Sequence, residues 1–298
     1  MCPLENATEE NQAIAAPVMY REFSDPIGEC GTPIDSHAVV GRFFRSSVIT
    51  SVRMKVLVSI LVATMVVVSL SAAQTRRTPR VHLAGDSTMA DKPTDPPNPE
   101  HGWGQLLPKF FREPAMIVNH AANGRSTRSF ITEGRWQKLV EALQPGDFVI
   151  IQFAHNDEKI FPNARGEFQH NLRRFVADVR AKQAIPVLAT PCARRSFDQA
   201  GKLIETHGDY PDAVRAVAAE TKTPLLEMNR LTMTLEEGHG PEGSKRLHLW
   251  IAPGVYQRQT AGYQDDTHYS AYGAERVAAL AVQEILRLQL PLSDWLRS

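Results

Sequence analysis

The feature that most restricts the fold is an alternation of short apolar runs with stretches of helical periodicity. Five short β-branched runs lie at 81–84, 116–119, 148–153, 186–190 and 224–228. The stretches between them place apolar residues at i, i+3, i+4 and i+7, as on one face of a helix. Strands that alternate with such helices predict a parallel sheet covered on both faces. Right-handed crossovers make this α/β chain a three-layer α/β/α sandwich, and we expect a single domain.

One segment near the N-terminus, residues 56–75, carries no charged side chain. It follows a short basic start and has small residues at 71–73, a pattern typical of a secretory signal peptide. We therefore expect a signal peptide at 54–73, a mature domain at 74–298 and a secreted or periplasmic protein. Residues 1–53 are then a mis-assigned upstream start or a disordered leader. The alternative is a cytoplasmic tail on an uncleaved anchor helix, since the segment is just long enough to span a bilayer.

Charge and cysteine content exclude several classes of protein. The 298 residues include 33 basic and 33 acidic side chains, so the formal net charge is zero. Without a net positive charge or a long basic run, no nucleic-acid partner is expected. The three cysteines, Cys2, Cys30 and Cys192, are too few and too scattered for a disulfide scaffold or a zinc site.

Polar side chains follow the first three apolar runs, in the segments GDST, NHAANGRS and AHND. The working residues of such sheets lie beyond the carboxyl ends of the strands. Gly85 lets the chain turn sharply out of the first run, which leaves Ser87 at the start of a turn or helix with an exposed hydroxyl. Ser87 is therefore a candidate nucleophile. The alternative is a helix N-cap, a position that serine also favours.

A serine hydroxyl needs a base to act as a nucleophile at neutral pH. His268 is the candidate base, in the segment DDTH before the last amphipathic stretch. Asp265, three residues upstream, would meet His268 on one face of a helical turn and orient its imidazole. We expect Asp266 to face solvent or to cap the turn. A metal-ligand pair or a capped helix start is the alternative, although no neighbouring cluster completes a metal site.

Two further residues are candidates to stabilise an oxyanion. Gly124 follows the second run and offers a backbone N–H in a tight loop, and Asn156 follows the third run and offers a side-chain amide. Each is also an ordinary turn residue. Their placement at adjacent strand ends favours the catalytic interpretation.

The segments GDSTMA, NHAANGRSTRSF, FAHND and DDTHYSAYGAERVA resemble the four ordered blocks of the SGNH (GDSL-type) hydrolases. They are most similar to the rhamnogalacturonan acetylesterase family, and the resemblance covers roughly 81–288. It implies a flavodoxin-like sandwich with a five-stranded parallel sheet. By position, it implies Ser87 as nucleophile, His268 as base, Asp265 as the orienting acid, and an oxyanion hole of Ser87, Gly124 and Asn156. One departure is Ala154, which stands where the third block usually has glycine.

The same resemblance implies a secreted serine esterase without a metal or organic cofactor. Its expected substrate is an acetylated plant cell-wall polysaccharide, pectic rhamnogalacturonan. Arg194 and Arg195 are candidate contacts for galacturonate carboxylates, with solvated surface arginines as the alternative. Trp250 belongs to 229–264, which we expect to form an irregular wall whose aromatic faces stack on sugars or pack the loop. We expect a monomer with no stable membrane association after signal cleavage.

Three other functions fit the same residues. An acetylxylan or other sugar-ester esterase would differ only in polymer preference. A GDSL lipase or thioesterase would differ in its acyl pocket. A non-catalytic carbohydrate-binding protein is disfavoured, because each catalytic position holds the required type of residue.

Overall fold

The computed structural model describes residues 77–94, 97–256 and 260–297. The expected leader at 1–53 and signal peptide at 54–73 lie outside the described residues. Within the described ranges, no helix has both the length and the apolar character needed to cross a bilayer.

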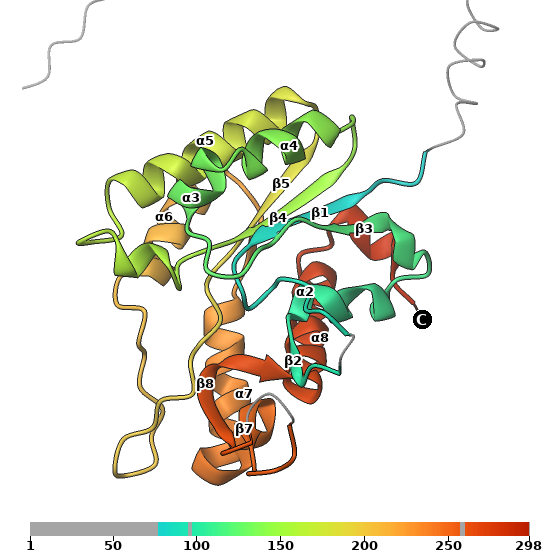
Figure 1. Cartoon of the computed structure of the whole chain (residues 1–298). Coiled ribbons are helices and arrows are strands. Elements are labelled where there is room, and N and C mark those ends of the chain that lie inside the picture. Colours follow the sequence, from blue (N-terminus) through green and yellow to red (C-terminus); the bar gives the residue numbers. More distant parts are fainter. Residues whose placement is uncertain (1–76, 95–96, 257–259, 298) are drawn as a thin grey trace, which may run out of the picture. The chain divides into compact units, whose positions relative to one another are not determined.

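The central element is a five-stranded parallel sheet with the order β3-β1-β4-β5-β6 (Figure 1). Its strands are β1 (Val81–Gly85), β3 (Ile117–Asn119), β4 (Phe148–Gln152), β5 (Ile185–Ala189) and β6 (Leu225–Leu226). Among these five strands, the second in sequence, β3, lies at the edge and the first, β1, lies beside it, which is the flavodoxin-like order. The predicted fold class is therefore confirmed, and the predicted strand bounds differ from the observed ones by one or two residues.

Helices cover both faces of this sheet (Figure 1). One face packs against α3 (Thr127–Thr132), α4 (Arg135–Ala142), α5 (Glu167–Ala181) and α6 (Tyr210–Thr221). The other packs against α2 (Trp103–Leu106), η1 (Leu107–Phe110) and α8 (Ala271–Arg287). Short 3₁₀ segments are η2 (Pro114–Met116), η3 (Asp157–Lys159) and η5 (Pro291–Trp295).

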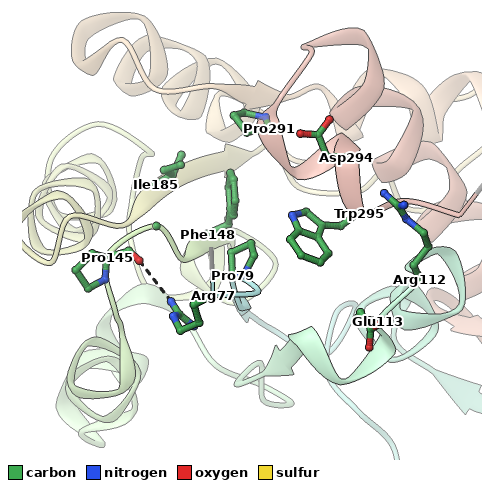
Figure 2. Close-up of a pocket in the computed structure, with 11 residues that line it drawn as sticks. Arg77, Pro79, Arg112, Glu113, Pro145, Phe148, Ile185, Pro291, Asp294 and Trp295 are labelled. Carbon is green, nitrogen blue, oxygen red and sulfur yellow. Dashed lines mark hydrogen bonds between the residues drawn. The ribbon is translucent and has the colours of Figure 1, made fainter. Parts of the chain in front are cut away.

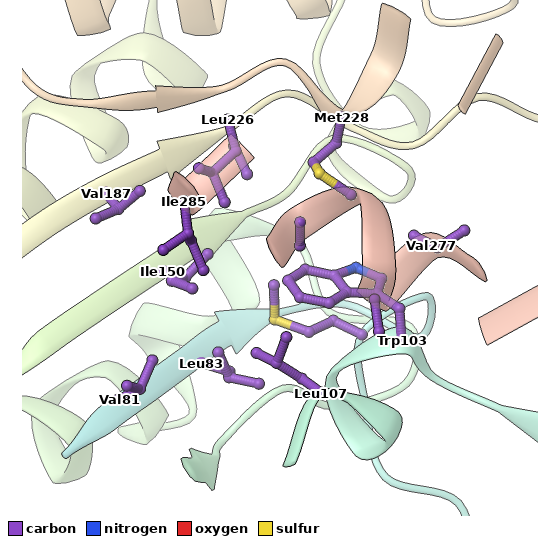
Figure 3. Close-up of a cluster of buried hydrophobic side chains, with 14 of the residues drawn as sticks. Val81, Leu83, Trp103, Leu107, Ile150, Val187, Leu226, Met228, Val277 and Ile285 are labelled. Carbon is purple, nitrogen blue, oxygen red and sulfur yellow. The ribbon is translucent and has the colours of Figure 1, made fainter. Parts of the chain in front are cut away.

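The strand β4 shows why a central strand is apolar over most of its length, here residues 148–151. Phe148 and Ile150 contribute to the core under α2 and α8, whereas Val149 and Ile151 contribute to the core under α3–α6. Successive side chains of a strand point to opposite faces, so a strand covered on both faces is apolar on both. The exception is Gln152 at the end of β4, which is buried and accepts the indole N–H of Trp103 at 2.7 Å. Figure 3 shows the first of these cores, where Trp103 lies between the sheet and α8.

A second, antiparallel sheet lies beyond the carboxyl end of the first, with the order β2-β8-β7. Its strands are β2 (Glu100–His101), β7 (His248–Ile251) and β8 (Tyr263–Ser270), and α7 (Met228–Gly243) and η4 (Ser244–Leu247) precede β7. The expectation of an irregular wall at 229–264 was therefore wrong for much of that segment. Glycines and Pro241 obscure its helical pattern, and Gly240 interrupts α7 with a positive φ of 67°.

Candidate active site

The turn after β1 brings Ser87 to the carboxyl edge of the sheet. A Cβ atom at Gly85 would lie 2.8 Å from the carbonyl oxygen of Gln152 on β4, so only glycine fits at this position. The carboxylate of Asp86 accepts hydrogen bonds from the backbone N–H and the hydroxyl of Thr88, at 3.0 and 2.8 Å. Asp86 therefore closes the turn. Ser87 does not cap a helix, and its hydroxyl is available for another partner.

That partner is His268, and a chain of hydrogen bonds continues to Asp265. The Oγ atom of Ser87 is 2.8 Å from Nε2 of His268, and Nδ1 of His268 is 2.7 Å from Oδ2 of Asp265. Burial alone would raise the pKa of Asp265. The hydrogen bonds from the side chain and backbone of His268 outweigh burial and hold that pKa well below its usual range. Because Asp265 is ionised, His268 carries its proton on Nδ1, which leaves Nε2 to accept the serine proton.

Asp265 and His268 meet in a way that the sequence spacing did not predict. Both belong to β8, and no helical turn brings them together. His248 and Leu249 are consecutive on β7, yet they pair with Tyr269 and Asp265 on β8. The intervening residues of β8 form a bulge, in which Oδ1 of Asp265 accepts the backbone N–H groups of Thr267 and His268. A bulge re-aims side chains next to a ladder, and here it turns both side chains toward each other.

The two oxyanion candidates line the same pocket as Ser87. Gly124 has a positive φ of 75°, a conformation that side chains rarely adopt. The Nδ2 atom of Asn156 donates to the carbonyl oxygen of Arg125 at 3.2 Å, while Lys159 donates to Oδ1 at 3.3 Å. One N–H of the Asn156 amide has no partner among these contacts and can serve a substrate oxygen. The roles of both residues stay predictions.

Ala154 occupies the position where the resembled family usually has glycine, and its backbone accounts for that preference. Its φ is 151°, a value that glycine adopts far more readily than alanine. The methyl group is fully buried in the core beneath α3–α6. The loop that carries Asn156 therefore keeps a backbone conformation typical of glycine. The methyl group of Ala154 packs in the core where glycine would have only a hydrogen atom.

Sequence reasoning did not single out the buried polar groups beneath the site. Oδ2 of Asp86 is 3.3 Å from Nδ1 of His155, a close contact that lacks hydrogen-bond alignment. Burial opposes ionisation of Asp86, yet His155 and Thr88 lower its pKa to about 2. Burial lowers the pKa of His155 and Asp86 partly offsets this. The segments GDST and AHND could have pointed to these two residues, because Asp86 directly precedes Ser87 and His155 directly precedes Asn156.

Asp157 connects the Asn156 loop to the start of α3. Its Oδ1 accepts the backbone N–H of Thr127 at 2.9 Å and the Thr127 hydroxyl at 2.5 Å. Burial raises the pKa of Asp157 to about 7, although both bonds from Thr127 act in the opposite direction. This contact helps to fix the distance between the Gly124 and Asn156 loops.

The pocket has a volume of about 650 Å³ and brings together most of the predicted residues. Its lining comprises Ser87, Glu100, Asn123, Gly124, His155, Asn156, Lys159, Arg194, Tyr263, Asp265, Thr267 and His268. Among the described residues, no three His, Cys, Asp or Glu side chains are grouped to hold a metal ion.

The three predicted substrate contacts have different positions. Arg194 lines the pocket but forms an ion pair with Glu158. Arg195 and Trp250 are not among the lining residues: both bind Oδ1 of Asp266, at 2.9 and 2.8 Å, and the guanidinium of Arg195 lies 4.9 Å from the indole. The Asp266 side chain is 45% exposed, in line with the expectation that it faces solvent, and its inner oxygen also holds this side-chain cluster. Trp250 lines a separate cavity of about 580 Å³.

A further cavity of about 700 Å³ lies at the opposite end of the sheet, where β4 and β5 begin (Figure 2). Phe148, Ile185 and Trp295 line it together with charged side chains such as Arg77 and Asp294. It contains no serine, cysteine or histidine among its lining residues and none of the predicted site residues. The predicted catalytic residues instead line the pocket at the carboxyl end of the strands.

Comparison with known proteins agrees with this geometry. The GDSL-like lipase/acylhydrolase family matches residues 83–276. The chain is 42% identical over 224 residues to the rhamnogalacturonan acetylesterase RhgT of Bacillus subtilis (strain 168), covering 74% of this chain and 94% of that protein. It is 31% identical over 219 residues to the probable rhamnogalacturonan acetylesterase YesY of the same strain, covering 72% and 95%.

A solved structure, that of the Bacillus subtilis protein YxiM, is similar with a TM-score of 0.60 and 27% identity. The similarity covers 72% of this chain and 58% of that one. The resemblance seen in the four sequence blocks is thereby confirmed. Since the family match extends over more than half of the chain, the chain belongs to the GDSL-like lipase/acylhydrolase family.

Proposed function

We propose that this chain is a secreted serine esterase that removes acetyl groups from an acetylated polysaccharide, and that this polymer is pectic rhamnogalacturonan. As a member of the family, the chain is a carboxylic ester hydrolase. The observation that carries the proposal is the hydrogen-bonded chain of Ser87, His268 and Asp265, which opens into a polar pocket. Similarity to RhgT, a rhamnogalacturonan acetylesterase, and to YesY, a probable one, supports the choice of substrate.

In the proposed reaction, Ser87 attacks the carbonyl carbon of the acetyl ester while His268 accepts the hydroxyl proton. The backbone N–H groups of Ser87 and Gly124 and the amide of Asn156 hold the negative oxygen of the tetrahedral intermediate. His268 then gives its proton to the departing sugar hydroxyl. Water, deprotonated by the same histidine, hydrolyses the acetyl-serine and releases acetate.

The character of the pocket supports a sugar ester over a lipid. None of its described lining residues has an aliphatic side chain, and Tyr263 is its single phenolic ring. A long acyl chain would find no aliphatic side chain among these lining residues to pack against, whereas sugar hydroxyls would find many hydrogen-bond partners. This favours a small acyl group such as acetyl over the fatty acyl group of a lipase or thioesterase.

The cations of the pocket support an acidic polymer. Lys159 lines the pocket and has no carboxylate partner among the described residues, unlike Arg194, which is paired with Glu158. An ammonium group that has no carboxylate partner in the described part of the chain and lies next to Asn156 suits the carboxylate of a uronic acid beside the acetylated sugar. This supports Lys159, ahead of Arg195, as the proposed contact for a galacturonate carboxylate.

Acetate release from acetylated rhamnogalacturonan, xylan and mannan tests the polymer preference. We expect the highest kcat/KM on rhamnogalacturonan, with Ser87→Ala as the inactive control. A series of nitrophenyl esters should show acetate cleaved far faster than octanoate. Preference for xylan would support the acetylxylan alternative, and preference for octanoate would support a lipase. Binding of polymer without any hydrolysis would support a carbohydrate-binding protein.

Secretion is tested separately. Expression of the full chain in a host with a general secretory pathway, followed by N-terminal sequencing of the exported protein, should give a start near Gln74. A product that retains residues 1–53 would contradict the proposed signal peptide and support the anchored alternative.

A further inference from the structure

Lys92 is buried beside the Ser87 turn, although lysine is seldom buried unless it is paired. The residue is 4% exposed, and its ammonium group has three partners. It donates to the backbone carbonyl of Ser87 at 2.7 Å and to Oδ1 of Asn123 at 2.5 Å, and Oε1 of Glu100 lies 2.7 Å away. An ammonium group has three hydrogens, so every donor of Lys92 is used.

These three partners belong to three different walls of the pocket. Ser87 is the proposed nucleophile, and Asn123 immediately precedes Gly124. Glu100 lies on β2, where it pairs with Ser270 at the end of β8, the strand that carries His268. One side chain thus links the nucleophile turn, the Gly124 loop and the sheet of the histidine.

The position of Lys92 is itself fixed by α2. Oε1 of Gln105 accepts the backbone N–H of Lys92 at 3.1 Å, and Nε2 of Gln105 donates to the carbonyl of Lys92 at 3.0 Å. The Gly124 loop, in contrast, has an exposed tip, and nothing lies within 4 Å of a Cβ atom placed on Gly124. Other bonds hold the two sides of this loop, such as that from the Ala122 N–H to the Gly85 carbonyl. The bond from Lys92 to Asn123 therefore adds an anchor at the exposed tip, next to Gly124.

We propose that Lys92 is a positioning residue for the esterase reaction, an inference that rests on the proposed function. It holds the Ser87 carbonyl and Asn123 so that the serine hydroxyl and the Gly124 N–H converge on one ester carbonyl. Lys92 does not contact the reacting atoms. Its effect comes from geometry, because oxyanion donors act only when they are held in place before the charge develops.

The test compares Lys92→Met with Lys109→Met in the full chain, using nitrophenyl acetate as substrate. Lys109 is an exposed lysine on η1 that pairs with Glu275 and does not line the pocket. Loss of positioning should lower kcat about ten- to hundredfold in Lys92→Met and change KM by less than about threefold. Lys109→Met should match the wild type in both constants.

A double variant separates positioning from a simple charge effect. Lys92→Met leaves Glu100 without its cation, which lowers stability. Adding Glu100→Gln removes that unpaired charge, so the melting temperature should recover while kcat stays low. Recovery of kcat in the double variant would overturn the inference, as would a kcat of Lys92→Met equal to that of Lys109→Met.

If Lys92→Met does not fold, Asn123→Ala decides the question, with the exposed Asn163→Ala as its control. This change removes one partner of Lys92 from an exposed loop, and we expect kcat to fall about tenfold at unchanged KM. Unchanged kcat would overturn the inference. Absence of ester hydrolysis by the wild type would instead overturn the proposed function, and the inference with it.

Discussion

Asp265 and Asp266 are adjacent in sequence but have different partners in the fold. Asp265 binds Nδ1 of His268, and Asp266 binds Arg195 and Trp250. Asp265→Asn should lower kcat by about 10⁴-fold, because the amide favours the wrong tautomer of His268. Asp266→Asn keeps an oxygen acceptor for both partners and should cost at most about threefold. Kinetics on an acetyl ester, with thermal melts to confirm folding, compare the two. The opposite ranking would assign the acid role to Asp266.

Asn156 is the side-chain donor of the proposed oxyanion hole. Asn156→Ala should lower kcat about 100- to 1000-fold with little change in KM, since the missing hydrogen bond forms mainly in the transition state. The exposed Asn163→Ala is the matched control, because it removes the same amide outside the pocket. Near-wild-type kcat in Asn156→Ala would mean that this residue only shapes the turn.

The start of α8 determines how the bulged strand β8 joins the main domain. A Cβ atom at Gly273 would lie 1.9 Å from the carbonyl oxygen of Leu247 on η4. The same turn is capped by Ser270, whose hydroxyl accepts the Gly273 N–H and donates to the Arg246 carbonyl. Contact with rigid backbone leaves no room for even one methyl group, although alanine is the better helix former.

Gly273→Ala should therefore lower the free energy of unfolding by about 3 kcal/mol, the upper end of the usual cost of overpacking. The control is Gly238→Ala on α7, where a Cβ atom would meet nothing within 4 Å and where alanine should add up to about 1 kcal/mol. Urea denaturation measures both changes. Equal stability of the two variants would show that η4 can move away from α8 at little cost.

The pair formed by the buried His82 and the half-buried His120 couples the stability of the whole domain to pH. Nδ1 of His82 lies 2.9 Å from Nε2 of His120, and the rings stack. Burial lowers the pKa of His82 in spite of Asp147, and burial together with His82 lowers the pKa of His120 to about 4. The unfolded chain binds these protons from its ordinary pKa of 6.5 downward, so stability is lost as pH falls from 6.5 toward 4.

Thermal melts at pH 7.5 and pH 5 should show this loss in the wild type and less of it in His120→Gln. The difference between the melting temperatures at pH 7.5 and pH 5 should be smaller in His120→Gln than in the wild type by about 2–4 °C. About 1 kcal/mol of stability produces such a change in a domain of this size. Asp157, whose raised pKa acts in the opposite direction, is common to both proteins and does not affect the comparison. If this difference in melting temperature is equal in both proteins, the histidine pair is not the cause of the loss of stability at low pH.

Local patterns were sufficient to predict the main sheet and the edge at which the site lies. Whether a run is a strand or a helix depends on the spacing of apolar residues within one segment, so β4 and α5 could be identified from their own sequences. Parallel strands end at a common edge. Ser87, Gly124 and Asn156 could therefore be placed together before their contacts were known, and all three line one pocket.

The tertiary structure alone decided which side chains meet across segments distant in sequence. The bulge that joins Asp265 to His268 depends on the register between β7 and β8, and the cluster of Asp266, Arg195 and Trp250 depends on the approach of a loop to that sheet. Periodicity within a segment carries no information about such pairings. For the same reason, the sequence around Lys92 indicates only an ordinary loop lysine. The fold brings three acceptors, from three walls of the pocket, to its ammonium group.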